Sequence, residues 1–240
     1  MFCLVTALTV IGVAPARAAS GYGYDVSYPQ CGKTLPSSAS FVVVGVNGGV
    51  PFKDNRCLGE QFRWIRRVKA DYGFYVNSAN PGATHDEWGK PGEMQCGGAS
   101  AEWGCAYNFG EAAARNAYDY AARVTKAAYG HRFWVDVEIA NAWSKTDTMA
   151  NIAVIQGMVD YLTARSGRIA GIYATPNHWR KITSSAQARG VPNWHAAAKN
   201  RTAAAAKCAE GGSLTGGPLL IVQFVVKGLD HDYWCGRSAA

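Results

Sequence analysis

The chain has 240 residues, of which 48% are hydrophobic and 17% are charged, and its formal net charge is +7. This composition is typical of an ordinary globular protein rather than of a disordered or fibrous one, and the length suffices for one domain with a large core. If the chain is exported, its basic balance favours polyanions at the cell envelope as partners. We expect no nucleic-acid partner.

The first residues have the features of a secretory signal peptide. An apolar run from Phe2 to Val13 is followed by Ala16-Arg17-Ala18, a small-residue site of the kind that signal peptidase cuts. The alternative, a membrane anchor, is disfavoured because the run is shorter than the about 20 residues of a spanning helix. We therefore expect a signal peptide over 1–19, a single domain over 20–240 and no stable membrane insertion.

The cysteines indicate disulfides. Seven are present, and removal of Cys3 with the signal peptide leaves six, an even number in an exported chain. Six cysteines allow many pairings, and we favour neighbours in sequence. The expected pairs are Cys31 with Cys57, Cys96 with Cys105, and Cys208 with Cys235. No C-x-x-C pair, phosphate-binding glycine loop or H-E-x-x-H motif is present, so we expect no metal and no cofactor.

Strand-like and helix-like stretches alternate along the chain at intervals of about 30 residues, the spacing of β/α units with a parallel sheet. The expected strands are 21–30, which runs into a turn, and 41–49, 73–82, 133–138, 169–176, 191–196 and 219–226. The expected helices are 55–69, 107–128, 147–165 and 177–188, whereas the alanine-rich 203–210 stays unassigned. The sequence therefore predicts a disulfide-stabilised, TIM-like (β/α) barrel of seven or eight units, with the long loop 82–104 as a candidate cleft wall.

Two carboxylates lie at the end of the strand 133–138. Side chains alternate across a strand, so Asp136 and Glu138 share one face while Val135 and Val137 share the other. The two acids repel each other, which raises the pKa of one of them and supplies a general acid beside a carboxylate. The alternative, a salt-bridged pair on an edge strand, lacks a Lys or Arg in local register.

Other acids fall where a barrel gathers its catalytic groups, at the C-terminal ends of different strands. Asp25 follows the first strand, Asp230 or Asp232 follows the last, and these two strands are neighbours in a closed barrel. We therefore expect four carboxyl groups at one mouth. The side chains expected to bind substrate there are Asn47, Asn77, Trp143, Tyr173 and Asp232.

A set of short motifs in this order is similar to glycoside hydrolase family 25. The motifs are Tyr24-Asp25-Val26-Ser27, Asp136-Val137-Glu138, Gly171-Ile172-Tyr173, and Gln223-Phe224 with Gly228-Leu229-Asp230. That family consists of lysozymes that cut the β-1,4 bond after N-acetylmuramic acid in peptidoglycan. The closer resemblance, over Tyr22 to Cys235, is to secreted actinobacterial glycoside-hydrolase-like proteins related to that family and to the DUF1906 group.

The resemblance implies a role for each acid. Glu138 matches the general acid, and Asp136 matches the partner that orients the N-acetyl group of the substrate or stabilises an oxocarbenium ion. Asp25 and Asp230 match the acids that line the first and last strands. One departure is Asn47-Gly48-Gly49, where the family often has a further acid.

Three classes of function follow from these features. The first is a monomeric, secreted glycoside hydrolase that acts on cell-wall glycan through strand-end carboxylates. The second is a barrel that binds glycan at the envelope without cutting it. The third is an envelope protein whose acids hold a divalent cation for another hydrolysis, such as phosphodiester cleavage.

Overall fold

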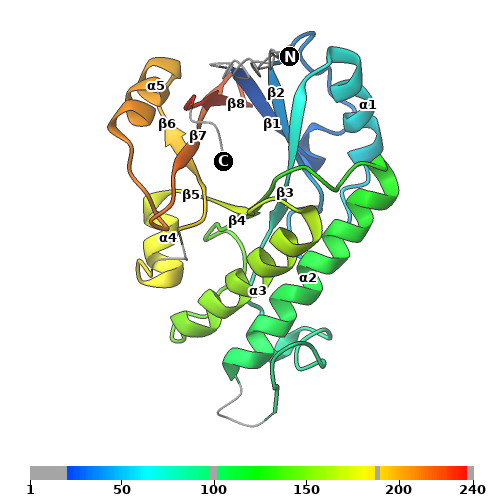
Figure 1. Cartoon of the computed structure of the whole chain (residues 1–240), viewed down its shortest axis with the longest axis vertical. Helices are drawn as coiled ribbons and strands as arrows, with labels where there is room; N and C mark the ends of the chain where they lie inside the picture. The colour runs from blue at the N-terminus through cyan, green and yellow to red at the C-terminus, as the bar shows by residue number, and fades with distance from the viewer. Residues whose placement is uncertain (1–20, 98–101, 187–189, 237–240) are drawn as a thin grey trace, which may run out of the picture.

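Eight strands form a closed barrel in chain order in the computed structural model, which describes residues 21–97, 102–186 and 190–236 (Figure 1). The strands are β1 (Tyr22–Val26), β2 (Phe41–Gly45), β3 (Asp71–Asn77), β4 (Phe133–Asp136), β5 (Gly171–Ala174), β6 (Asn193–Ala198), β7 (Leu219–Val226) and β8 (Leu229–Trp234). The predicted TIM-like barrel is confirmed. The signal peptide expected over 1–19 lies outside the described residues.

Helices cover the outside of the barrel. They are α1 (Leu58–Val68), α2 (Glu102–Thr125), α3 (Thr148–Ser166), α4 (Pro176–Thr183) and α5 (Arg201–Glu210), with short 3-10 turns η1 (Tyr28–Gln30) and η2 (Gly82–Thr84). Side-chain caps start several of them: Asp147 accepts from the Ala150 amide and Asn200 accepts from the Ala203 amide, each at 2.9 Å. The second cap begins α5, the helix that its alanine-rich composition left unassigned.

The last strand differs from the prediction. Strands β1 to β7 run parallel to their neighbours, but β8 runs antiparallel to both β7 and β1. The sequence placed the final strand at 219–226 and did not predict β8. Lys227 (φ 51°) and Gly228 (φ 76°) form a two-residue hairpin turn with both φ values positive. The barrel is therefore closed by a hairpin instead of an eighth β/α unit, and β8 begins at the end where the parallel strands finish.

The core has an inner and an outer layer. Val43 of β2 packs inside the barrel with Trp134 and Trp194, whereas Val42 and Val44 face the helices. Both faces of β2 are buried, as its β-branched sequence predicted for a parallel sheet covered by helices.

Helices α2 and α3 lie side by side in Figure 1, and glycine allows their close approach. A Cβ atom placed on Gly157 of α3 would lie 2.2 Å from the Tyr107 carbonyl oxygen of α2. A Cβ atom on Gly110 of α2 would lie 2.1 Å from the Val154 carbonyl oxygen. The two backbones are thus in direct contact at this crossing.

Three disulfides join the predicted cysteine pairs: Cys31–Cys57, Cys96–Cys105 and Cys208–Cys235. The preference for neighbours in sequence is therefore confirmed. Across the described part of the chain, no helix has both the length and the apolar content needed to cross a bilayer.

Candidate active site

A cavity of about 350 Å³ opens at the C-terminal ends of the parallel strands, and we call it the mouth pocket. Four carboxyl groups line it, those of Asp25, Asp136, Glu138 and Asp230. They come from β1, from the end of β4 and from the start of β8. The structure therefore brings together the four acids that the sequence placed at one mouth.

Strand register explains this convergence. Asn77 of β3, Asp136 of β4 and Tyr173 of β5 occupy the same rung of the parallel sheet. On the other side of the barrel, Asp25 of β1 is paired with Asp230 of β8. The antiparallel direction of β8 places Asp230 at the mouth, because this residue lies just after the hairpin turn.

The carboxyl group of Asp136 is held by a chain of two asparagines. The Asn77 side-chain amide donates a hydrogen bond to Asp136 Oδ2. Asn47 in turn exchanges two hydrogen bonds with the Asn77 backbone, at 2.9 and 3.0 Å. Asn47 is not among the lining residues, so it orients Asn77 from behind. The other oxygen of Asp136, Oδ1, is buried and has no hydrogen-bond partner among the described residues.

Asp25 is oriented by a residue to which the sequence analysis gave no role. Gln223 Nε2 donates to Asp25 Oδ2 at 2.8 Å, and the Tyr173 hydroxyl donates to Gln223 Oε1 at 3.0 Å. Gln223 is the only amide side chain in the apolar stretch Leu219–Val226. A single polar residue in a buried strand is the sequence feature that could have indicated a role for it.

Asp232 lies beneath the mouth pocket rather than on its wall. Its carboxyl group is fully buried and accepts a hydrogen bond from Trp194 Nε1 at 2.9 Å through Oδ1, while Oδ2 has no hydrogen-bond partner among the described residues. Burial, followed by the charge of Asp25, raises the pKa of Asp232 well above its usual range. The neutral, protonated form of this carboxyl group is therefore favoured beneath the mouth pocket.

Burial raises the pKa of each lining acid, and the charges of neighbouring acids raise the pKa values of Asp25, Asp136 and Glu138 further. Burial, with the charge of Asp230, raises the pKa of Asp25 to about 8, against the opposing hydrogen bond from Gln223. Burial, then the charges of Glu138 and Asp25, raise the pKa of Asp136 well above its usual range. Burial and the charge of Asp230 raise the pKa of Glu138. The mouth pocket therefore retains protons near neutral pH and can supply a proton to a substrate.

Glu138 lies just beyond β4. Of the two acids at this strand end, it is more open to a ligand than Asp136, which is buried. Its side chain is 33% exposed, and its Oε1 lies 3.9 Å from His178 Nδ1. The Glu138 carbonyl oxygen accepts from Trp143 Nε1 at 2.8 Å. Trp143, expected to bind substrate, is not among the residues that line the mouth pocket, and its ring N–H instead holds the loop after β4. Burial lowers the pKa of His178, so a neutral imidazole faces Glu138.

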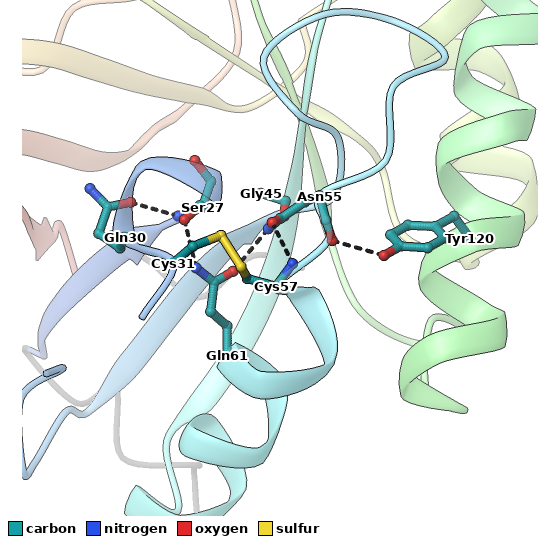
Figure 2. The surroundings of a disulfide bond; sticks show 8 residues. All are labelled: Ser27, Gln30, Cys31, Gly45, Asn55, Cys57, Gln61 and Tyr120. Atoms are coloured by element: carbon teal, nitrogen blue, oxygen red, sulfur yellow. Dashed lines mark hydrogen bonds between the residues drawn. A yellow bond between two sulfur atoms is a disulfide. The ribbon is translucent and has the colours of Figure 1, made fainter. Parts of the chain in front are cut away.

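One wall of the mouth pocket is the segment Ser27–Cys31, whose first three residues line it. Figure 2 shows how a polar network and the Cys31–Cys57 disulfide hold this segment against the start of α1. Asn55 Nδ2 donates to the Gly45 carbonyl at 2.7 Å and to Gln61 Oε1 at 2.9 Å, and Gln61 Nε2 donates to the Ser27 carbonyl at 2.6 Å. No local sequence pattern indicates this network, because its members are far apart along the chain.

The described part of the long loop 82–104, which we expected to form a cleft wall, does not line the mouth pocket. It packs on α2, where the rings of His85 and Trp88 contact Phe109. Within the residues that the structure describes, no cluster of three or more His, Cys, Asp or Glu side chains has an arrangement that could hold a metal ion.

A closed β/α barrel with acids at its mouth is the fold of the family 25 lysozymes, and comparisons with known proteins bear out this likeness. The family model described as Lysozyme-like protein 1 matches residues 107–210, a segment that contains Asp136 and Glu138 but not Asp25 or Asp230. A search of curated proteins found no match.

Solved structures extend the likeness over nearly the whole chain. The muramidase from Trichobolus zukalii has a TM-score of 0.60 and 17% identity, with 91% of this chain and 94% of that chain covered. A family GH25 lysozyme from Aspergillus fumigatus has a TM-score of 0.59 and 15% identity, with 89% and 93% covered. The bacterial lysozyme from Streptomyces coelicolor has a TM-score of 0.58 and 17% identity, with 90% and 92% covered. These similarities establish a family 25-like barrel fold.

Proposed function

We propose that the protein is a secreted glycoside hydrolase that cuts cell-wall glycan in the manner of a peptidoglycan muramidase. The observation that carries this proposal is the convergence of four carboxyl groups with raised pKa values on one cavity of about 350 Å³. Glycoside hydrolysis needs a protonated carboxyl group next to a second carboxylate or a substrate amide at the anomeric carbon.

Glu138 is the proposed general acid. Its raised pKa keeps the proton available, and its partial exposure gives a glycosidic oxygen access to the carboxyl group. In the proposed reaction, Glu138 transfers its proton to the leaving oxygen as the bond to the anomeric carbon breaks. A water molecule then adds its oxygen to the anomeric carbon and returns a proton to Glu138. Asp230, which also lines the cavity, contributes to the raised pKa of Glu138.

Asp136 is the proposed partner of the reacting sugar. Asn77 occupies its Oδ2, while Oδ1 is buried without a hydrogen-bond partner among the described residues. A rotation of the carboxyl group toward the cavity would let Oδ1 accept a hydrogen bond from an acetamido N–H. That bond would favour the ionised carboxylate, which in turn would stabilise positive charge at the anomeric carbon or orient the acetamido oxygen toward it. Tyr173, which is partly exposed, provides aromatic surface on the same cavity for a sugar ring.

Export and processing are part of the proposal. Removal of residues 1–19 would leave a barrel domain from residue 20 onward, and three disulfides suit an oxidising extracellular environment. We also propose the relationship to actinobacterial and DUF1906-type glycoside-hydrolase-like proteins, and a monomeric state.

The test is the release of reducing ends from purified peptidoglycan and from arabinogalactan-bearing walls by the mature protein. We expect Glu138→Gln to lower the rate by at least about a hundredfold, because general acid catalysis typically contributes that much. Glu210→Gln is the matched control, since Glu210 is exposed at the end of α5. It should retain the full rate, and both variants should keep the thermal midpoint of the parent to within a few degrees.

Other outcomes would redirect the assignment. Binding to the wall without release of reducing ends would support a non-catalytic glycan-binding barrel. Loss of hydrolysis on addition of a chelator would favour the metal-dependent class instead. An unchanged rate in Glu138→Gln would remove this residue from the role of general acid.

A further inference from the structure

A second cavity, of about 440 Å³, lies at the opposite end of the barrel, where the parallel strands begin, and we call it the basal pocket. Its polar wall comes from the residues that precede β4 and β5, namely His131, Arg132 and Arg168. Tyr72 from the start of β3 and Trp234 from the end of β8 supply aromatic walls. None of these residues lines the mouth pocket.

Two arginines are held next to each other in the basal pocket by a reciprocal pair of hydrogen bonds. Arg132 Nη1 donates to the carbonyl oxygen of Ile169, next to Arg168. Arg168 Nε donates to the carbonyl oxygen of Gly130, close to Arg132 in sequence, at 3.2 Å. Each guanidinium is thus hydrogen-bonded to the backbone of the segment that carries the other arginine. Because each bond uses one N–H group, donors remain on both side chains.

These two positive charges have no acidic partner. Over the described residues, no carboxylate oxygen lies within salt-bridge distance of either guanidinium. Burial, together with the charge of Arg168, lowers the pKa of Arg132 to about 10, so the pair is charged at neutral pH and mutually repulsive. Asp71 also lines the pocket, but it is exposed, and its charge acts on His131. A bound anion would relieve the repulsion between the arginines.

The rest of the pocket is aromatic. The His131 ring stacks on Tyr72 with 4.0 Å between ring centroids, and its Nδ1 lies 3.2 Å from the Tyr72 carbonyl oxygen. Arg132 also lies over the Trp134 ring at 5.8 Å. The guanidinium of Arg132 is therefore fixed from below by an aromatic ring and from the side by a backbone carbonyl. Fixed guanidinium groups are well suited to recognise phosphate and carboxylate oxygens.

We propose that the basal pocket is a second binding site, which holds an oxyanion group, phosphate or carboxylate, carried by an anionic cell-wall polymer. The net charge of +7, or +6 once Arg17 leaves with the signal peptide, attracts such polymers to the molecule as a whole. The choice of a wall polymer rests on the proposed function, whereas binding of an oxyanion does not. Because the site lies at the opposite end of the barrel from the mouth pocket, it would hold the protein on the wall while the mouth engages a glycan strand.

The experiment measures binding of inorganic phosphate and of acetate to the mature protein by NMR titration, then co-sedimentation with insoluble wall. The wall is used before and after hydrofluoric acid treatment, which removes phosphodiester-linked polymers and leaves the carboxylates of peptidoglycan. We expect shifts of Arg132 and Arg168 side-chain signals with the anions. We also expect wall binding about tenfold weaker in Arg132→Gln/Arg168→Gln.

Matched variants separate this site from general charge and from misfolding. Arg56→Gln/Lys199→Gln removes the same charge from exposed positions and should weaken wall binding by less than about twofold, the part that general charge contributes. Arg168→Gln alone, a change at an exposed side chain, should already weaken binding. Hydrolysis of short soluble glycan fragments should be unchanged in all of these variants, since the mouth pocket is intact.

The treated wall identifies the source of the anion. Loss of binding after treatment assigns phosphate polymers, and retained binding that still depends on the two arginines assigns peptidoglycan carboxylates. The proposal is overturned if neither anion shifts the arginine signals. It is also overturned if the arginine and control variants lose wall binding equally.

Discussion

At the scale of single residues, the acids of the mouth pocket link stability to pH. The pKa of Asp25 is about 8 in the folded protein, whereas an unfolded aspartate titrates near 4. Between about pH 4 and pH 8 the folded state therefore holds a proton that the unfolded state releases. This contribution to stability is fully present below pH 4 and is lost as the pH rises through 8.

We predict that the thermal midpoint falls as the pH is raised from 5 to 8. Each pH unit over which the folded state alone keeps one proton costs about 1.4 kcal/mol. Replacing Asp25 by Asn removes the titrating group, so the slope should be shallower in that variant. Scanning calorimetry at several pH values measures the effect. A midpoint that rises over this range would show that Asp25 is ionised in the folded protein.

The acids of the site were predictable from sequence because strand alternation and barrel topology place them. Asp136 and Glu138 share a face by spacing alone, and Asp25 belongs to the first strand of a closed barrel. The supporting side chains were harder to find. Gln223 and Asn47 act through hydrogen bonds to residues more than 25 positions away, and no local pattern indicates such partners.

At the scale of secondary-structure elements, the close crossing of α2 and α3 depends on Gly157, which has no side chain. We predict that Gly157→Ala destabilises the protein by about 1–3 kcal/mol, although alanine is the better helix former. The reason is the Tyr107 carbonyl oxygen, 2.2 Å from the position of the new Cβ atom. Gly59→Ala on α1 is the control, because its Cβ would have no neighbour closer than 3.5 Å. Denaturant unfolding of both variants should give opposite signs.

The strand β8 shows why element prediction was incomplete. Its sequence places Asp230 and Asp232 on alternate positions with His231 between them, a polar pattern unlike that of a core strand. The acids face the barrel interior and its mouth, so the pattern is that of a functional strand. The glycine of the preceding Lys227-Gly228 turn is the sequence feature that could have indicated a hairpin here.

Two disulfides close loops of nearly equal length, but only Cys31–Cys57 holds the segment Ser27–Cys31 at the mouth pocket. Comparing their removal tests whether this segment contributes to substrate binding. Cys31 and Cys57 are separated by 26 residues, and Cys208 and Cys235 by 27. Loop closure predicts that loss of either bond costs about 3 kcal/mol. We predict that Cys31→Ser/Cys57→Ser also raises KM for wall glycan, because it releases residues that line the mouth pocket.

The Cys208→Ser/Cys235→Ser variant should lose similar stability and keep its KM, because neither residue lines the mouth pocket. Thermal unfolding and steady-state hydrolysis, both measured well below the midpoint, provide the comparison. Equal KM values in the two double variants would mean that the disulfide next to the mouth does not position this wall.

At the scale of the whole molecule, charge is divided between the two ends of the barrel. The mouth pocket has four acids, but their raised pKa values reduce its negative charge near neutral pH. The basal pocket has two arginines without acidic partners among the described residues, and the chain as a whole is at +7. An anionic wall therefore attracts the protein while the mouth offers little repulsion to a glycan strand.

This distribution predicts that ionic strength affects two substrates differently. Hydrolysis of insoluble wall should fall several-fold between about 0.05 and 0.5 M salt, because screening weakens attraction between the basic protein and a polyanionic surface. Hydrolysis of short soluble glycan fragments should change by less than about twofold, since it depends on short-range contacts inside a partly desolvated pocket. Initial rates on both substrates, with the pH held constant, test the prediction. If both rates fall in parallel, salt acts on the mouth pocket itself, and the net charge of the protein does not determine its hold on the wall.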